Sequence, residues 1–182
     1  GHPYIAVREL LKKKLKSEEP QYYISHGSAM DIHQMVTQPQ FTVFVTTNKQ
    51  LNKKSILGTE FKFITTKKDY FFGFKKHWVT PSESVLVSNL ERTIIDGLKS
   101  PEYCGGIIEV AKGVWIKKDT INIDQLVSYA AQINNSAVSG RLGFILETYG
   151  MLSEVHGSFL KKQLRKSYAF LDPMSLEEGK YM

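Results

Sequence analysis

Two acidic residues and a lysine have the types and the order of a metal-dependent nuclease site. Asp31 precedes Glu60-x-Lys62, and residues 60–65 alternate as a strand does, so that Glu60 and Lys62 share one face. In restriction-type nucleases two such carboxylates hold Mg²⁺ and the lysine helps to position the attacking water. A charged strand face gives the same spacing, with a cross-strand ion pair in place of a metal site. A metal-dependent nuclease is therefore the alternative function that we carry forward.

The other reactive residue types do not complete a catalytic pattern in the sequence. His26 and His33 are seven residues apart, and there is no HExxH or His-x-His spacing for a metal. The single cysteine, Cys104, precedes two glycines but has no evident base nearby in sequence. Nucleophile elbows and glycine-rich phosphate loops are absent from the sequence. We expect no catalytic residue, no metal and no cofactor, and hence a non-enzymatic protein.

Positive charge is concentrated in the first half of the sequence. Residues 1–80 hold 13 basic and 6 acidic residues, a balance of +7, whereas residues 81–182 hold 11 and 12, a balance of −1. This asymmetry favours a polyanion such as DNA as a partner, although a solvated lysine face would look the same. The candidate DNA-binding residues are Lys49, Lys53, Lys54, Lys67, Lys68, Lys75 and Lys76. Because no arginine lies among them to read bases, we expect contacts to the DNA backbone.

A dense polar cluster lies in an otherwise apolar helical stretch that begins near residue 88. Ser88 and Glu91 have the spacing of a capping box, and the buried stripe runs on from Leu90. Arg92 and Asp96 are four residues apart and so lie on the same side of that helix. We interpret them as an ion pair that clamps the helix to the sheet, and not as an active-site helix.

Periodicity predicts an α+β domain whose sheet comes first and whose helices follow. An N-terminal helix over about 4–16 and a short helix between 25 and 35 accompany a mixed or antiparallel sheet. The expected strands are 22–24, 41–46, 60–65, 70–79 with a bend at Gly73, and 84–87, with 49–58 as a basic hairpin loop. About five helices then follow, over 88–98, 106–117, 122–133, 138–149 and 153–166. We treat residues 1–182 as a single domain, with a β-rich half over about 20–87 and a helical half over about 88–166.

Length and composition agree with this architecture. The chain has 182 residues, of which 42% are hydrophobic and 23% charged, the balance of an ordinary globular domain. The longest apolar stretch is far short of a membrane span, so we expect no membrane association. With one cysteine and no secretion signal at the start, a reducing cytoplasm is the expected location.

Several ordered motifs resemble the AbiEi-type antitoxins of type IV toxin–antitoxin systems, which are described as predicted transcriptional regulators of viral defence. The first is residues 23–30, with Ser28 inside it and His33 following. The second is residues 85–96, which contains Ser88, Glu91, Arg92 and Asp96. The remaining matches are Pro101, residues 105–107, residues 141–147 beginning at Arg141, and residues 171–173.

The resemblance implies a regulator of abortive infection and antiviral defence. In that family an N-terminal winged helix binds operator DNA, and a larger C-terminal domain neutralises a nucleotidyltransferase-like toxin and can assist DNA binding. This sequence resembles the C-terminal domain alone, because residues 4–16 are too few for a winged helix. The implied partners are the toxin and DNA, and a homodimer is compatible with the same features.

Overall fold

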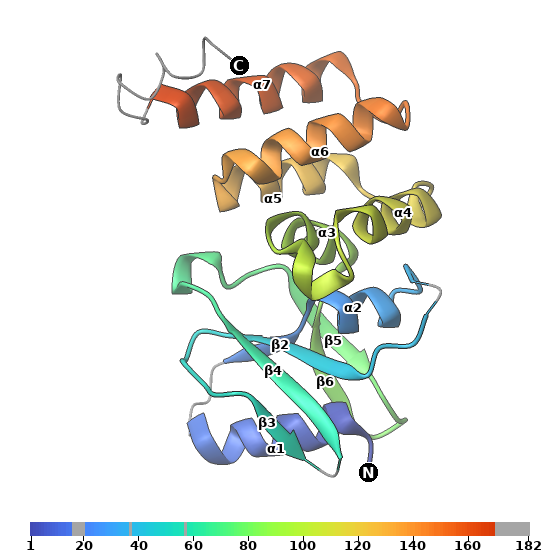
Figure 1. Cartoon of the computed structure of the whole chain (residues 1–182), viewed down its shortest axis with the longest axis vertical. Helices are drawn as coiled ribbons and strands as arrows, with labels where there is room; N and C mark the ends of the chain where they lie inside the picture. Colours follow the sequence, from blue (N-terminus) through green and yellow to red (C-terminus); the bar gives the residue numbers. More distant parts are fainter. Residues whose placement is uncertain (16–20, 37, 57, 170–182) are drawn as a thin grey trace. The chain divides into compact units, whose positions relative to one another are not determined.

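The computed structural model describes residues 1–15, 21–36, 38–56 and 58–169, with side chains through residue 165. Lys16, which the predicted first helix includes, and the matched residues 171–173 lie outside that part. The chain divides into two compact units, Gly1–Asn122 and Ile123–Met182. Figure 1 shows the sheet in the first unit and helices alone in the second. The predicted α+β class is confirmed: a mixed sheet comes first and five α-helices follow it in the described residues.

A six-stranded mixed sheet forms the body of the first unit. Its strands are β1 (Tyr22–Ile24), β2 (Thr42–Thr47), β3 (Lys54–Ile56), β4 (Thr59–Thr65), β5 (Phe74–Trp78) and β6 (Ser84–Ser88), in the order β3-β4-β2-β1-β6-β5. The pairs β2/β4 and β1/β6 are parallel and the others are antiparallel. The short central strand β1 sets the register, with Ile24 opposite both Val45 and Val87. β3 and β5 are the two edges.

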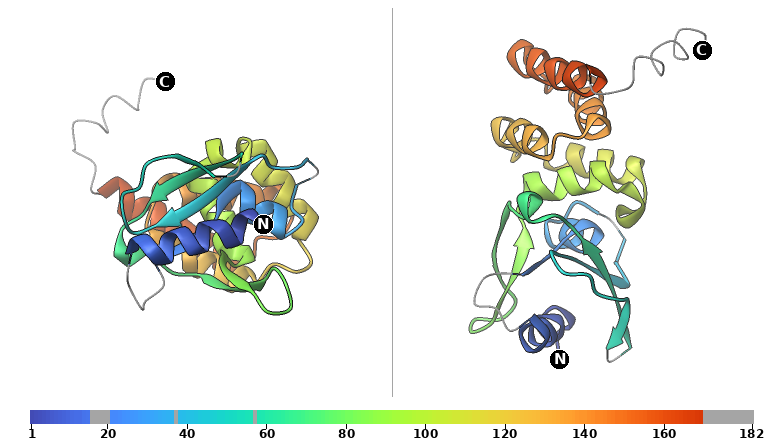
Figure 2. Two further views of the ribbon diagram at one scale, coloured as in Figure 1. Left: turned by 90° about the horizontal axis from the view of Figure 1, so that it is seen from below. Right: turned by 90° about the vertical axis from the view of Figure 1, so that its left-hand side faces the viewer.

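The apolar core of the first unit lies between the sheet and helix α1 (Pro3–Leu15). Val7 and Leu11 of α1 pack with Val45, Phe61 and Val87, and all five side chains are buried. The left view in Figure 2 shows α1 crossing the strands. The alternation in β2 and β4 produces this packing, because every second side chain points to the same face. Lys12, Lys13 and Lys14 crowd the last turn of α1, where positive charge suits the helix dipole.

Three further helices complete the first unit. They are α2 (His26–Ile32), α3 (Leu90–Lys99) and α4 (Ile107–Lys117), with the 3₁₀ turn η2 (Pro101–Cys104) between the last two. α2 contacts β2 and α3, while α3 contacts β6 and α4. Gly105 and Gly106 turn the chain into α4 with φ of +79° and +101°, which only glycine adopts without strain.

Three predictions about local structure are wrong in detail. Residues 49–58 are not a hairpin loop, because β2 and β4 run parallel and the connection carries the edge strand β3. The strand expected over 70–79 begins only at Phe74, after the 3₁₀ turn η1 (Lys68–Tyr70) and Gly73 at φ +76°. Ser88 and Glu91 do not form a capping box. Asn89 caps α3 instead, its side-chain oxygen accepting from the backbone N–H of Arg92 at 2.8 Å.

The second unit consists of α5 (Ile123–Ile133), α6 (Ser136–Thr148) and α7 (Glu154–Ala169). Asn135 caps α6 by accepting from the backbone N–H of Val138, and Gly150 ends the following turn with φ +67°. Leu126, Leu142, Leu146 and Leu160 are buried leucine side chains of this unit. In the described part of the chain, no helix is both long and apolar enough to cross a bilayer.

Candidate interaction surfaces

The most distinctive sequence motif forms a buried ion pair. Arg92 and Asp96 on α3 are 2% and 4% exposed, and the Arg92 Nε donates to Asp96 Oδ1 at 2.9 Å. The hydroxyl of Tyr23 on β1 donates to the other carboxylate oxygen at 3.2 Å. The guanidinium of Arg92 also lies 4.5 Å from the ring centroid of Phe72. Arg92 and Asp96 lie on one side of α3, and the contact with Tyr23 ties α3 to the central strand of the sheet.

The serine–histidine motif joins the sheet to α2. Thr46 Oγ1 donates to Ser25 Oγ at 2.8 Å, and His26 Nδ1 lies 2.8 Å from the same oxygen. Ser28 Oγ accepts from the backbone N–H of Phe44 at 2.9 Å. His26 begins α2 with φ of +50°, a left-handed backbone that turns the chain sharply out of β1. These contacts are internal to the fold, and they hold β1, β2 and α2 together.

Ser88 and Glu91 also make internal contacts. Ser88 ends β6, and its hydroxyl lies 2.7 Å from Thr93 Oγ1 inside the unit. Glu91 Oε1 accepts from the backbone N–H of Asn122 at 2.8 Å, so that α3 holds the chain after α4. The remaining motif residue, Arg141, is exposed on α6 of the second unit.

Burial changes the acid–base properties of this region. Loss of hydration lowers the pKa of His26, an effect that Arg92 reinforces and Asp96 opposes. Burial also lowers the pKa of His33, whose Nε2 lies 2.7 Å from the backbone oxygen of Ser88. The thiol of Cys104 is buried and its pKa is raised for the same reason. A raised pKa disfavours the thiolate, so Cys104 is not activated as a nucleophile.

The nuclease candidates make contacts that do not involve a metal. Glu60 Oε2 lies 2.8 Å from the ammonium of Lys53, across the β3/β4 pair. The Lys62 ammonium lies 4.5 Å from the ring centroid of Tyr103. Asp31 is exposed near the end of α2. Among the described residues no group of three or more histidines, cysteines or acidic residues is placed to hold a metal ion. These contacts favour the cross-strand ion pair as the role of Glu60.

The candidate DNA-binding lysines are exposed, and the strand order separates them. Lys53 and Lys54 lie at the β3 edge, whereas Lys75 and Lys76 lie on β5 at the opposite edge. Lys49, Lys67 and Lys68 lie in the connections after β2 and β4. Neighbouring residues of a strand point to opposite faces, and the exposure of both Lys75 and Lys76 means that β5 is open on both sides. The lysines of β3 and β5 therefore occupy two separate edges of the sheet.

An exposed apolar face on α4 was not found by sequence reasoning. Ile108 is 67% exposed, Ile116 48% and Trp115 47%. Val110 and Val114 are the buried anchors, and their spacing turns Ile108 and Trp115 to the other side. The Lys118 ammonium lies 3.7 Å from the Trp115 ring centroid. A large exposed apolar patch with a polar rim is typical of a protein-binding surface.

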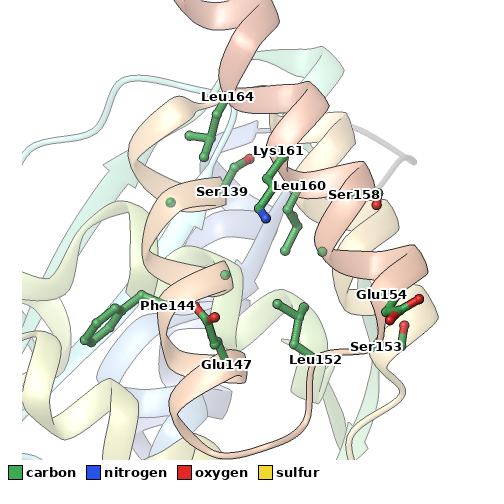
Figure 3. Close-up of a pocket in the computed structure, with 13 residues that line it drawn as sticks. Ser139, Phe144, Glu147, Leu152, Ser153, Glu154, Ser158, Leu160, Lys161 and Leu164 are labelled. Carbon is green, nitrogen blue, oxygen red and sulfur yellow. The ribbon is translucent and has the colours of Figure 1, made fainter.

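The second unit contains a groove of about 620 Å³ between α6 and α7. Figure 3 shows Leu160 and Leu164 of α7 pointing toward α6, while Phe144 of α6 points away. Gly140 and Gly143 line the α6 side of the groove without side chains. A Cβ at Gly140 would make an ordinary contact with Leu164, and a Cβ at Gly143 would do the same with Leu160. The groove has a mixed polar and apolar lining and holds no constellation of catalytic groups among the residues that line it.

Comparison with protein-family models gave no match to this chain.

Proposed function

We propose that this chain is a domain of an antitoxin-like transcriptional regulator that acts in the cytoplasm. It binds and neutralises a nucleotidyltransferase-like toxin, and it assists DNA binding through its exposed lysines. The sequence resemblance to AbiEi-type antitoxins suggests these partners. The polar motif residues support a binding domain and not an active site. The side chains of Arg92, Asp96 and Ser28 bond to other atoms inside the fold.

The exposed apolar face of α4 carries the protein-binding part of the proposal. Ile108, Trp115 and Ile116 follow one another along one side of the helix, and aromatic residues of this kind dominate the energy of protein interfaces. Lys112 lies between Ile108 and Trp115 along the same side of the helix and pairs with Glu109 at 3.0 Å, and the Lys118 ammonium lies over the Trp115 ring. A complementary surface would have an apolar pocket with acidic groups opposite these lysines, and we assign that surface to the toxin.

A growth assay tests the neutralising role. The chain is coexpressed with a nucleotidyltransferase-like toxin of the type IV class, as wild type and as Ile108→Ala/Trp115→Ala. We expect the wild type to restore growth and the double variant to fail, because truncating central anchors costs about 2 kcal/mol or more. Trp78→Ala is the matched control, since Trp78 is a 62% exposed tryptophan on β5. Equal rescue by all three chains would contradict the assignment of α4.

A DNA titration tests the second role and the alternative function together. Binding of a duplex from the upstream region is measured over a range of salt, with and without Mg²⁺. We expect affinity to fall linearly with salt on a logarithmic plot and the DNA to stay intact. Mg²⁺-dependent cleavage that Glu60→Ala abolishes would overturn the proposal in favour of the nuclease.

A further inference from the structure

The outer face of α7 carries exposed apolar side chains between opposite charges. Val155 is 77% exposed and Phe159 39%, one turn apart, while Leu160 on the opposite face is buried at 2%. Glu154 begins the helix, and Lys162 follows two turns later, both exposed, whereas Lys161 lines the groove toward α6. Small Ser158, also exposed, lies midway between the acidic and basic ends.

This charge pattern is complementary to itself. Two copies of α7 can lie antiparallel about a twofold axis at Ser158. Residues at equal distances before and after Ser158 then lie opposite each other in the two copies. Glu154 of each copy then faces Lys162 of the other, and Val155 of each lies beside the apolar stem of that lysine. A parallel arrangement would instead place the basic ends together, so charge selects the antiparallel one.

The spacing on the same face also suits helix pairing. Val155, Ser158, Lys162 and Arg165 are separated by three, four and three residues, the interval that keeps one stripe of a helix against a partner helix. A small residue at the centre allows the two backbones to approach closely. Twofold interfaces of this kind use the same patch on both subunits.

We propose that the outer face of α7 is a homodimer interface, in which two copies of this chain pair antiparallel about Ser158. The interface is separate from the α4 face and does not depend on the proposed function. A dimer would present two α4 faces and two sets of exposed lysines in one particle. For a DNA-binding protein this doubles the phosphate contacts available on one duplex.

Charge reversal with rescue tests the interface. Sedimentation velocity over a range of protein concentrations measures the dimerisation constant of the whole chain. Glu154→Lys and Lys162→Glu should each weaken dimerisation on the order of tenfold, and the double variant that combines them should recover most of the affinity. Glu147→Lys is the matched control, because it makes the same charge change at an exposed position on α6 and should leave dimerisation unchanged.

A cross-linking experiment tests the position of the axis. Ser158→Cys places a thiol at the proposed twofold axis, where two copies meet, and the native Cys104 is 1% exposed and does not compete. We expect Ser158→Cys to form a disulfide-linked dimer on mild oxidation much faster than Gln132→Cys, an exposed position on α5. A monomer at all concentrations, or equal cross-linking at both positions, would overturn the proposal, and so would a double variant that stays as weak as its parents. The α7 face would then belong to a different partner.

Discussion

The two units of this chain differ in what they bury. Among the described residues, ten buried polar or charged side chains lie in the first unit, including Ser25, His26, Arg92 and Asp96, whereas Ser139 is the one in the second. The first unit depends on a specific polar network beneath its sheet, and the second on leucine packing between three helices. Buried polar groups are costly when a partner is removed, whereas apolar packing tolerates small changes. Single substitutions should therefore affect the two units very differently.

The largest effect is expected at the buried ion pair. Asp96→Ala leaves the Arg92 charge buried without its carboxylate and removes the acceptor of Tyr23. We expect the free energy of unfolding to fall by about 3–5 kcal/mol, measured by urea denaturation. Glu60→Ala removes the exposed partner of Lys53 and should cost about 0–1 kcal/mol. Equal destabilisation by the two substitutions would mean that the polar network is not what stabilises the first unit.

A pair of glycine substitutions contrasts the units directly. At Gly27 a Cβ would lie 2.9 Å from the backbone oxygen of Tyr103, so Gly27→Ala should destabilise the first unit by about 1–3 kcal/mol. At Gly140 inside α6 the nearest atom would be 3.7 Å away. Gly140→Ala should therefore stabilise the second unit by about 0.5–1 kcal/mol through helix propensity. Thermal unfolding of both variants checks the signs, and a tolerated Gly27→Ala would contradict the close packing of α2 on η2.

The buried histidines predict a dependence on pH. The pKa of His26 is lower in the folded state than in the unfolded state, so the unfolded chain binds the proton first. The contribution of neutral His26 to the free energy of unfolding is therefore complete above about pH 6.5. It declines as the pH falls below that value, by up to about 1.4 kcal/mol per pH unit for one such group. Urea denaturation at several pH values measures the slope. His26→Asn, which tolerates the positive φ, should reduce the slope, and an unchanged slope would assign the effect to other groups.

The smallest effect concerns the two lysine edges. Lys53 is already paired with Glu60, whereas Lys75 and Lys76 are exposed on β5 at the other edge. We expect Lys75→Ala/Lys76→Ala to reduce the salt slope of DNA binding by about one for each phosphate that the protein no longer neutralises. Lys53→Ala/Lys54→Ala should change it less. The reverse order would place the DNA along the β3 edge.

Most of the fold follows from local signals in the sequence. Alternation in residues 60–65 predicts β4, and the apolar stripe from Leu90 predicts α3. The strand order does not follow, because the parallel pairs β2/β4 and β1/β6 join segments that are distant in sequence. β3 was missed for the same reason. It has three residues at an edge, of which Ile56 alone is apolar, so its pairing with β4 and not a hydrophobic pattern makes it a strand.

The candidate sites were harder to predict than the fold. The Arg92–Asp96 pair could be placed on one helix side by spacing, but its contact with Tyr23 depends on the sheet. The α4 face was missed because Val110, Val114 and Trp115 all look apolar, and only their packing shows which are buried. Strict use of the helical period would separate them, since Val110 and Val114 are one turn apart and Trp115 is rotated away from them.

Binding and stability measured on two variants test the central claim, that the motif acts inside the fold and the α4 face acts outside it. Asp96→Asn and Trp115→Ala are compared with wild type by calorimetric titration with the nucleotidyltransferase-like protein and by urea denaturation. We predict that folded Asp96→Asn binds as wild type but unfolds at lower urea, and that Trp115→Ala is as stable as wild type but binds on the order of tenfold or more weakly. A folded Asp96→Asn that fails to bind, with Trp115→Ala binding normally, would contradict the account.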